Sequence, residues 1–284
     1  MKLKVSELFY SAQGEGRFVG VPSIFLRTFG CNFTCAGFGC KPGETSTEAD
    51  EVAKNIHLYK DFLSLPLVNT GCDSYASWHP AFKDLSPTIE TGELVDRLLE
   101  LTPNHRWVQN NGNDVHLVIT GGEPLLGWQR VYEELLSNER MQDLENLTFE
   151  TNGTQILAPA FREAWEKYQY ATELFFSVSP KLWNVAGEKR EKAIKPLVVK
   201  QYYDLSPHGQ LKFVCNGSEA AWNEIEEVIK LYRDMGVMYP IWIMPLGGTL
   251  EGQQGEIDGH IPAYKIADEA LNRGYHVAAR VHAY

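Results

Sequence analysis

The chain has 284 residues, enough for one large domain with a sizeable core or for two small ones. Hydrophobic residues make up 44% and charged residues 22%, which is ordinary for a soluble globular protein, and no apolar run is long enough to span a bilayer. The formal net charge of −11 disfavours a nucleic-acid partner, because gripping a phosphate backbone depends on clustered Lys and Arg. The N-terminal MKLKVSELFY lacks the apolar stretch of a signal peptide, so the expected location is the cytoplasm.

Apolar runs rich in β-branched and aromatic residues predict seven buried strands, most of which end in Gly, Asn or Pro. Between them, apolar residues at three- and four-residue spacing predict helices. Strands that alternate with helices indicate an α/β fold with a parallel sheet and outer helices, and six or seven such units suggest a full or partial barrel. The predicted strands cover residues 22–30, 114–122, 146–153, 173–180, 210–217, 240–248 and 276–284, and the clearest helices cover 92–102, 219–236 and 261–274.

One stretch, residues 36–70, fits this alternation poorly. It contains KPGETSTEADEVAK and then LPLVNTG, which lack the pattern of a buried strand. We interpret it as a loop insertion with one short helix after the capping residues Ser46 and Thr47. Residues 1–284 are therefore predicted to form a single domain that carries this insertion.

The C-terminal ends of the predicted strands carry polar or glycine-rich motifs. In barrels of this kind, functional residues lie at that rim, and core packing alone does not require Gly, Glu, Asn and Lys there. Each motif taken alone is also compatible with an ordinary turn. The motifs are TGGEP at 120–124, ETNGT at 150–154, SVSPK at 177–181, CNG at 215–217 and MPLGG at 244–248.

Four of the five cysteines, Cys31, Cys35, Cys40 and Cys72, fall in one segment, and Cys215 stands apart as a predicted core thiol. An odd number of cysteines without a signal peptide argues against a disulfide framework and favours metal or redox use. Four thiolates would fill a structural zinc site, whereas three on a four-iron cluster would leave one iron open. Four unrelated buried thiols are a further interpretation. The residues alone leave Cys40 and Cys72 as alternative third ligands.

Seven motifs in order resemble the radical S-adenosylmethionine enzymes and, more narrowly, the 7-carboxy-7-deazaguanine synthase (QueE) family. GCNFTC from Gly30 and GCDSYASW from Gly71 look like the cysteine motif of that superfamily with an insertion before its last cysteine. SAQGEG and GVPSIFLR precede them, and TGGEP, ETNGT and SPK follow. Each motif is weak by itself, but together they cover nearly the whole chain.

The resemblance implies a partial, incomplete β/α barrel and a 4Fe–4S cluster held by Cys31, Cys35 and Cys72. The family's third cysteine stands directly before Asp-Thr, and here Asp73 and Ser74 follow Cys72, which leaves Cys40 aside. The resemblance makes Ser74 a Mg²⁺ ligand, since its hydroxyl keeps the oxygen that this cation prefers. Two departures are the long gap between Cys35 and Cys72, where the family has a short spacer, and Gly71, where an aromatic residue is common.

The resemblance also assigns binding residues. An arginine suits a substrate carboxylate because it can pair with it bidentately, although a surface ion pair is the alternative role for Arg27. Glu150 and Asn152 either line the site or shape a turn. The implied contacts are Gly122, Glu123, Ser179, Pro180, Lys181 and Asp73 for S-adenosylmethionine, and Ala12, Gln13, Gly14, Arg27 and Thr120 for the substrate.

The implied activity is a radical ring contraction of 6-carboxy-5,6,7,8-tetrahydropterin to 7-carboxy-7-deazaguanine with loss of ammonia, in queuosine or deazapurine biosynthesis. It implies a small pterin substrate, an external flavodoxin-like or ferredoxin-like electron donor and a homodimer, without a nucleic-acid or membrane partner. The alternatives are another radical S-adenosylmethionine enzyme, such as a glycyl-radical activase, and a non-catalytic zinc-binding module. His276 and His282 are expected to be structural.

Overall fold

The computed structural model describes residues 1–168, 172–256 and 260–280. A nine-stranded sheet forms its centre, with the strand order β3-β1-β2-β4-β5-β6-β7-β8-β9. The strands are β1 (Lys2–Ala12), β2 (Pro22–Thr28), β3 (Thr88–Glu90), β4 (His116–Gly121), β5 (Asn146–Thr151), β6 (Glu173–Val178), β7 (Gly209–Cys215), β8 (Ile241–Pro245) and β9 (His276–Val277).

Parallel pairing runs from β2 through β4 to β9, whereas β1 is antiparallel to both β2 and β3. No hydrogen-bonded ladder in the described ranges joins β9 back to β1 or β3, so the sheet is a partial barrel and the predicted fold class is confirmed. The antiparallel edge was not among the seven predicted strands. β3 has three residues and pairs with β1 only at Lys2–Lys4, which leaves the second half of β1 along the open seam.

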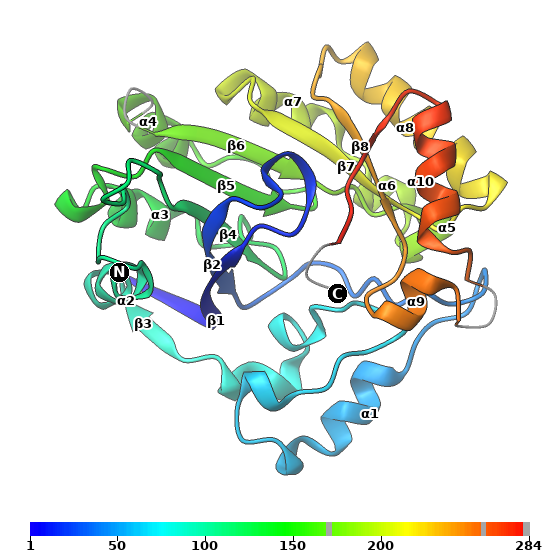
Figure 1. Cartoon of the computed structure of the whole chain (residues 1–284), viewed down its shortest axis with the longest axis horizontal. Helices are drawn as coiled ribbons and strands as arrows, with labels where there is room; N and C mark the ends of the chain where they lie inside the picture. Colours follow the sequence, from blue (N-terminus) through cyan, green and yellow to red (C-terminus); the bar gives the residue numbers. More distant parts are fainter. Residues whose placement is uncertain (169–171, 257–259, 281–284) are drawn as a thin grey trace.

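Helices cover the outside of the curved sheet, as Figure 1 shows, while α1 lies apart at the bottom of that view. The three predicted helices and the short helix after Ser46–Thr47 are observed. The helices are α1 (Glu48–Lys54), α2 (Thr91–Leu101), α3 (Gln129–Leu136), α4 (Pro159–Tyr168), α5 (Trp183–Ala186), α6 (Arg190–Ala193), α7 (Pro196–Leu205), α8 (Glu219–Asp234), α9 (Leu250–Gln254) and α10 (Ala263–Asn272). Short 3₁₀ turns cover Gly16–Phe18, Ile56–Leu58, Phe62–Ser64, Tyr75–Ser77, Pro80–Leu85 and Glu139–Met141. None of these described helices is both long and apolar enough to cross a bilayer.

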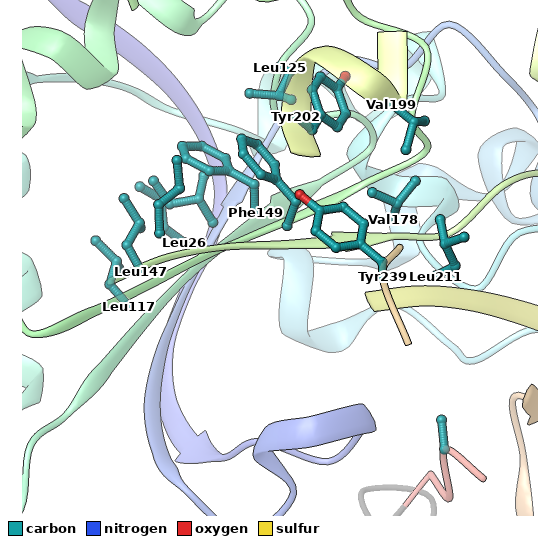
Figure 2. Close-up of a cluster of buried hydrophobic side chains, with 14 of the residues drawn as sticks. Leu26, Leu117, Leu125, Leu147, Phe149, Val178, Val199, Tyr202, Leu211 and Tyr239 are labelled. Atoms are coloured by element: carbon teal, nitrogen blue, oxygen red, sulfur yellow. The ribbon is translucent and has the colours of Figure 1, made fainter. Parts of the chain in front are cut away.

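Side chains alternate between the two faces of the parallel strands. On the outer face, Leu117, Phe149 and Leu211 are fully buried in the main core (Figure 2). The ring of Phe149 lies 6.0 Å from that of Phe176. The ring of Tyr202, from α7, stacks on Phe176 at 4.7 Å. Burial of each such aromatic ring stabilises the fold by about 2–3 kcal/mol.

The inner face of the sheet carries many polar residues, and a segment after β1 packs against it at the N-terminal ends of the strands. Phe18 packs edge-on against His116 and Phe175, at 4.5 Å and 4.9 Å between ring centres. Gln210 accepts a hydrogen bond from the backbone N–H of Arg17 and donates one to Ser177. The chain between β1 and β2 therefore passes through the barrel interior. It leaves the barrel open at the C-terminal ends of the parallel strands.

Residues 36–70 form loops, α1 and two short 3₁₀ turns. They help to enclose a second, smaller hydrophobic cluster, which is built around Val68, Tyr75, Ala76 and Phe82 and packs against Val52 and Ile56. The predicted C-terminal strand is shorter than expected, because β9 ends at Val277. His276 stacks on Trp242 at 4.7 Å, whereas His282 lies outside the described residues.

Candidate active site

A cavity of about 440 Å³ opens at the C-terminal ends of the parallel strands. The strand-end motifs around Thr120, Glu150, Ser179 and Met244 all reach its wall. The N-terminal segment and both ends of the cysteine segment complete it. Among the residues that the family resemblance singles out, its lining includes Ala12, Gln13, Gly14, Arg27, Cys31, Cys72, Asp73, Ser74, Thr120, Gly122, Ser179 and Lys181. Cys35, Glu123 and Pro180 do not line it.

The loop that carries the first two cysteines follows β2 directly and is held from outside. Cys35 adopts a left-handed backbone conformation with φ +49°, which is unfavourable for a residue with a Cβ atom. The Glu188 carboxylate accepts hydrogen bonds from the backbone N–H groups of Thr34, at 3.1 Å, and Cys35, at 2.8 Å. Glu188 thus stabilises the strained turn, and sequence reasoning missed this role.

Cys31, Cys35 and Cys72 lie close enough to influence one another electrostatically. Burial raises the pKa of Cys31 to about 12 and also raises the pKa of Cys35, and in both cases charge on Cys72 raises it further. Burial likewise raises the pKa of Cys72, while the Lys181 ammonium lowers the pKa of all three thiols.

Cys40 has a different environment. Burial raises the pKa of its thiol, whereas a hydrogen bond involving Thr70 lowers it. The nearby charges of Glu44 and Glu48 raise it further. Its thiol faces the carbonyl of Ala36 at 3.5 Å. Cys72, and not Cys40, therefore lines the cavity with Cys31 and influences the thiols of the loop.

The donor set can be compared with what a metal requires. Across the described ranges, no three His, Cys, Asp or Glu side chains converge tightly enough to hold a single metal ion. A four-cysteine zinc site needs such convergence. A four-iron cluster does not, because each thiolate binds a different iron, so three neighbouring thiols, of which Cys31 and Cys72 line the cavity, fit the cluster better than zinc.

The glycines of TGGEP allow β4 to pass close to the cysteine loop. A Cβ on Gly121 would lie 2.2 Å from the carbonyl oxygen of Thr28, and one on Gly122 would lie 2.4 Å from that of Gly30 and 2.8 Å from the Cβ of Cys31. A side chain at either position would therefore collide with the segment that carries the first cysteine.

Glu123 follows these glycines but is fully buried instead of facing the cavity. Its carboxylate accepts hydrogen bonds from the Thr151 hydroxyl at 2.8 Å, the Asn152 N–H at 2.7 Å and the Leu125 N–H at 3.1 Å. Burial raises its pKa to about 7, against the lowering effect of these hydrogen bonds. In this structure Glu123 positions the ETNGT motif, where Asn152 in turn donates to Asn32 of the cysteine loop at 2.9 Å.

Ser179 and Lys181 lie together on the cavity wall, where the Lys181 ammonium donates to the Ser179 hydroxyl at 3.1 Å and lies 5.8 Å from the ring of Phe38. Elsewhere on the wall, Arg27 pairs with Glu7 at 3.1 Å and donates to the Ser74 hydroxyl at 3.1 Å. Arg27 is thus both ion-paired and turned towards the cavity. It also joins strands β1 and β2 to the segment that carries Cys72.

Gln13 is buried, and its side-chain oxygen accepts from the N–H groups of Gly14 at 2.8 Å and Glu15 at 3.2 Å. These bonds shape the turn that follows β1 and aim Glu15 into the cavity.

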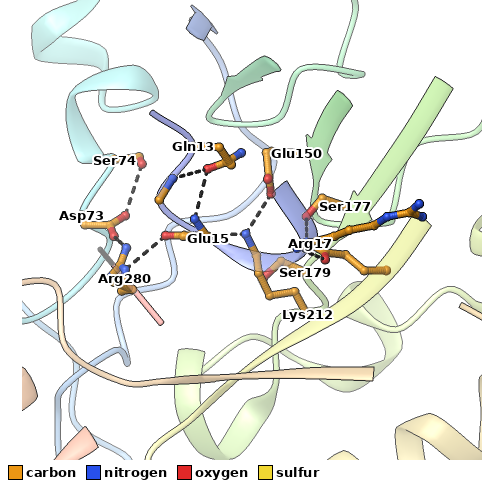
Figure 3. Close-up of polar contacts among 12 residues, drawn as sticks. Gln13, Glu15, Arg17, Asp73, Ser74, Glu150, Ser177, Ser179, Lys212 and Arg280 are labelled. Carbon is orange, nitrogen blue, oxygen red and sulfur yellow. Dashed lines mark hydrogen bonds and ion pairs between the residues drawn. The ribbon is translucent and has the colours of Figure 1, made fainter. Parts of the chain in front are cut away.

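Three charged residues on the wall were not among the predicted site residues: Glu15, Lys212 and Arg280 (Figure 3). Lys212 donates to Glu15 at 2.6 Å and to Glu150 at 2.9 Å. A lysine within the apolar run QLKFVC was a usable signal, because a charge on a buried strand requires partners. Arg280 gave no comparable signal, since its contacts come from distant parts of the chain.

Comparison with known proteins finds no matching family model. Curated 7-carboxy-7-deazaguanine synthases are similar along the chain: that of Pyrobaculum aerophilum is 27% identical over 99% of this chain and 93% of its own length, and that of Rhodopirellula baltica is 26% identical over 98% and 84%. The crystal structure of QueE from Escherichia coli has the same fold, with a TM-score of 0.56, 19% identity and coverage of 99% of this chain and 95% of that one. These full-length similarities confirm the resemblance that the ordered motifs predicted.

Proposed function

We propose that this protein is a 7-carboxy-7-deazaguanine synthase that converts 6-carboxy-5,6,7,8-tetrahydropterin to 7-carboxy-7-deazaguanine and ammonia. The observation that carries the proposal is the cavity itself, which Cys31 and Cys72 line together with the SAQGEG segment and Arg27, while Cys35 is buried close enough for both thiols to influence it. The similarity to curated synthases along nearly the whole chain supports it. The overall reaction is redox-neutral, because the product is the substrate less one ammonia.

In this proposal Cys31, Cys35 and Cys72 hold a 4Fe–4S cluster, and Ser179, Lys181, Gly122 and Asp73 hold S-adenosylmethionine. Bound together, the cluster and S-adenosylmethionine supply a carbon-centred radical that removes a hydrogen atom from the substrate. The Lys181 ammonium suits the carboxylate of the methionine moiety, since it lies on the cavity wall, where it donates to the neutral Ser179 hydroxyl and lies over the ring of Phe38. Glu123 and Pro180 then act by shaping the wall.

The chain's own contribution is orientation. We propose that Ala12, Gln13, Gly14 and Thr120 bind the pterin ring, and that Arg27 binds its carboxylate. Ser74, beside Arg27, would hold a Mg²⁺ ion through its hydroxyl, and the ion would supply positive charge near the substrate. The proposal further includes an external one-electron donor of the flavodoxin or ferredoxin type, a cytoplasmic location and a homodimer, and size-exclusion chromatography tests the dimer.

An anaerobic product assay tests the function. Purified protein, reconstituted with iron and sulfide, is incubated with the carboxylated pterin, S-adenosylmethionine, Mg²⁺ and dithionite. We expect a deazaguanine product identified by its ultraviolet spectrum and mass, formed together with 5′-deoxyadenosine. Formation of 5′-deoxyadenosine without a deazaguanine would instead favour another radical enzyme. A colourless protein with one zinc and no iron or sulfide would favour the zinc-binding module.

A further inference from the structure

Two segments that lie at opposite ends of the sequence meet across the open side of the partial barrel. Glu15 stands three residues beyond β1, and Arg280 stands three residues beyond β9. Their side chains pair at 3.2 Å, and each is 14% exposed. This ion pair therefore joins the continuations of the first and last strands, where the described strands form no ladder.

Arg280 has two further partners, so that its three nitrogens reach three separate segments. One nitrogen donates to the carboxylate of Asp73, the residue after Cys72, and another donates to the carbonyl of Gly247 beyond β8, at 3.1 Å. Although burial alone lowers the pKa of Arg280, the carboxylates of Asp73 and Glu15 raise it above its usual value. The guanidinium therefore stays charged, and its planar fork matches several acceptors at once.

The pairing continues among residues that line the cavity, as the dashed lines in Figure 3 show. Asp73 pairs with Arg280, Arg280 with Glu15, Glu15 with Lys212, and Lys212 with Glu150. All five residues line the cavity, and Lys212 is only 4% exposed. Asp73, at one end of this series of alternating charges, belongs to the segment with the third cysteine. Glu15, in the middle of the series, belongs to the segment proposed to bind the pterin.

We propose that Arg280 is a positioning residue that holds Asp73, beside the cluster and S-adenosylmethionine, in a fixed place relative to Glu15, beside the substrate. This inference rests on the proposed function and deepens it. Radical chemistry needs the two bound molecules at close range, because a small misplacement lets the radical be quenched elsewhere. Arg280 therefore acts on the coupling between cleavage of S-adenosylmethionine and formation of product, and it need not contact either reacting molecule.

The experiment compares Arg280→Gln with wild-type holoenzyme and measures deazaguanine formed per 5′-deoxyadenosine formed. We expect Arg280→Gln to lower this ratio about tenfold or more, by loosening the geometry while S-adenosylmethionine is still cleaved. Arg273→Gln is the matched control, since Arg273 pairs with Glu226 and Glu269 on α8 and α10, away from the cavity. In an Arg280→Gln variant that folds, a ratio within twofold of wild type, with or without an equal loss of both products, would overturn the proposal.

Arg280→Lys covers the case in which the glutamine variant does not fold, because it keeps the positive charge. One ammonium cannot reproduce the planar fork, so we expect a ratio at least about threefold below wild type. A wild-type ratio in this variant would also contradict the proposal.

Hydrogen exchange gives a readout that does not depend on the pterin reaction. We expect faster exchange in Arg280→Lys at the amides of residues 13–17 and at Ala278, which bonds to the carbonyl of Ile243 at 2.8 Å, and unchanged exchange in Arg273→Gln. If the wild type makes no deazaguanine, the proposed function fails, and the exchange data alone decide whether Arg280 joins these segments. If the wild type makes product but the Arg280 variants match it in ratio and exchange, only the positioning role fails.

Discussion

At the scale of single residues, the cysteine segment separates two thiols that the sequence alone left as alternatives. Cys72 shares its surroundings with Cys31, Cys35 and Lys181, whereas Cys40 lies among Thr70, Glu44 and Glu48. We expect Cys72→Ala to abolish iron binding after anaerobic reconstitution, because the cluster loses one of three ligands. Cys40→Ala, its matched control, should keep the wild-type iron and sulfide content. Equal loss of iron in both variants would contradict this assignment.

Glu188 is a second residue-scale feature, because its carboxylate holds the N–H groups of Thr34 and Cys35 in a turn that is unfavourable for cysteine. We expect Glu188→Ala to lower retention of iron about 10-fold in a chelator competition, the usual effect of losing a group that orients a ligand. Glu191→Ala removes an exposed carboxylate from α6 and should retain iron normally. Normal retention in Glu188→Ala would show that the turn does not need this support.

At the scale of elements, the core strands and the amphipathic helices could be predicted because their residues carry the pattern locally. The six strands from β2 to β8, leaving out β3, match predicted runs, and α2, α8 and α10 match predicted helices. β3 could not be found, because three residues form a strand only through pairing with β1. β9 stops at Val277, since only His276 and Val277 pair with β8.

The contact between the end of β4 and the cysteine loop leads to a prediction at this scale. A Cβ on Gly122 would overlap the carbonyl oxygen of Gly30, so Gly122→Ala must shift one of the two elements. We expect a loss of stability of about 1–3 kcal/mol, with a lower thermal midpoint and less iron per chain. Gly92→Ala, on α2 with nothing within 4 Å of the added Cβ, should be neutral or slightly stabilising. If both variants melt alike, the close approach has no energetic role.

At the scale of the whole molecule, the candidate site is assembled from residues that are far apart in the sequence. The strand-end motifs could be predicted to meet, because parallel strands present their C-terminal ends at one rim. The pairing of Glu15 with Arg280, 265 residues apart, could not, since it depends on how both chain ends fold into the barrel. The segment after β1 that packs inside the barrel also buries polar groups of the inner face, among them His116.

His116 makes the stability of the whole molecule sensitive to acid. Its side chain is 1% exposed, packs against the ring of Phe18 and forms a hydrogen bond with the hydroxyl of Thr148 at 2.8 Å. Burial lowers the pKa of His116 from 6.5 to about 4. Between these two values the unfolded chain takes up a proton that the folded chain excludes. The free energy of unfolding therefore falls as the pH drops below about 6.5 and levels off near pH 4, by about 3 kcal/mol in all.

His116→Gln tests this acid sensitivity, because an amide keeps a partner for Thr148 and does not titrate. We expect the variant to be less stable than wild type at pH 7.5, by about 1–3 kcal/mol, since the ring packing against Phe18 is lost. From pH 7.5 to pH 5 it should lose about 2 kcal/mol less stability than wild type, as measured by urea unfolding with tryptophan fluorescence. His57→Gln, at an exposed histidine in the 36–70 segment, should follow the wild-type pH profile. Parallel profiles for His116→Gln and wild type would mean that the barrel interior admits a proton on His116 without unfolding.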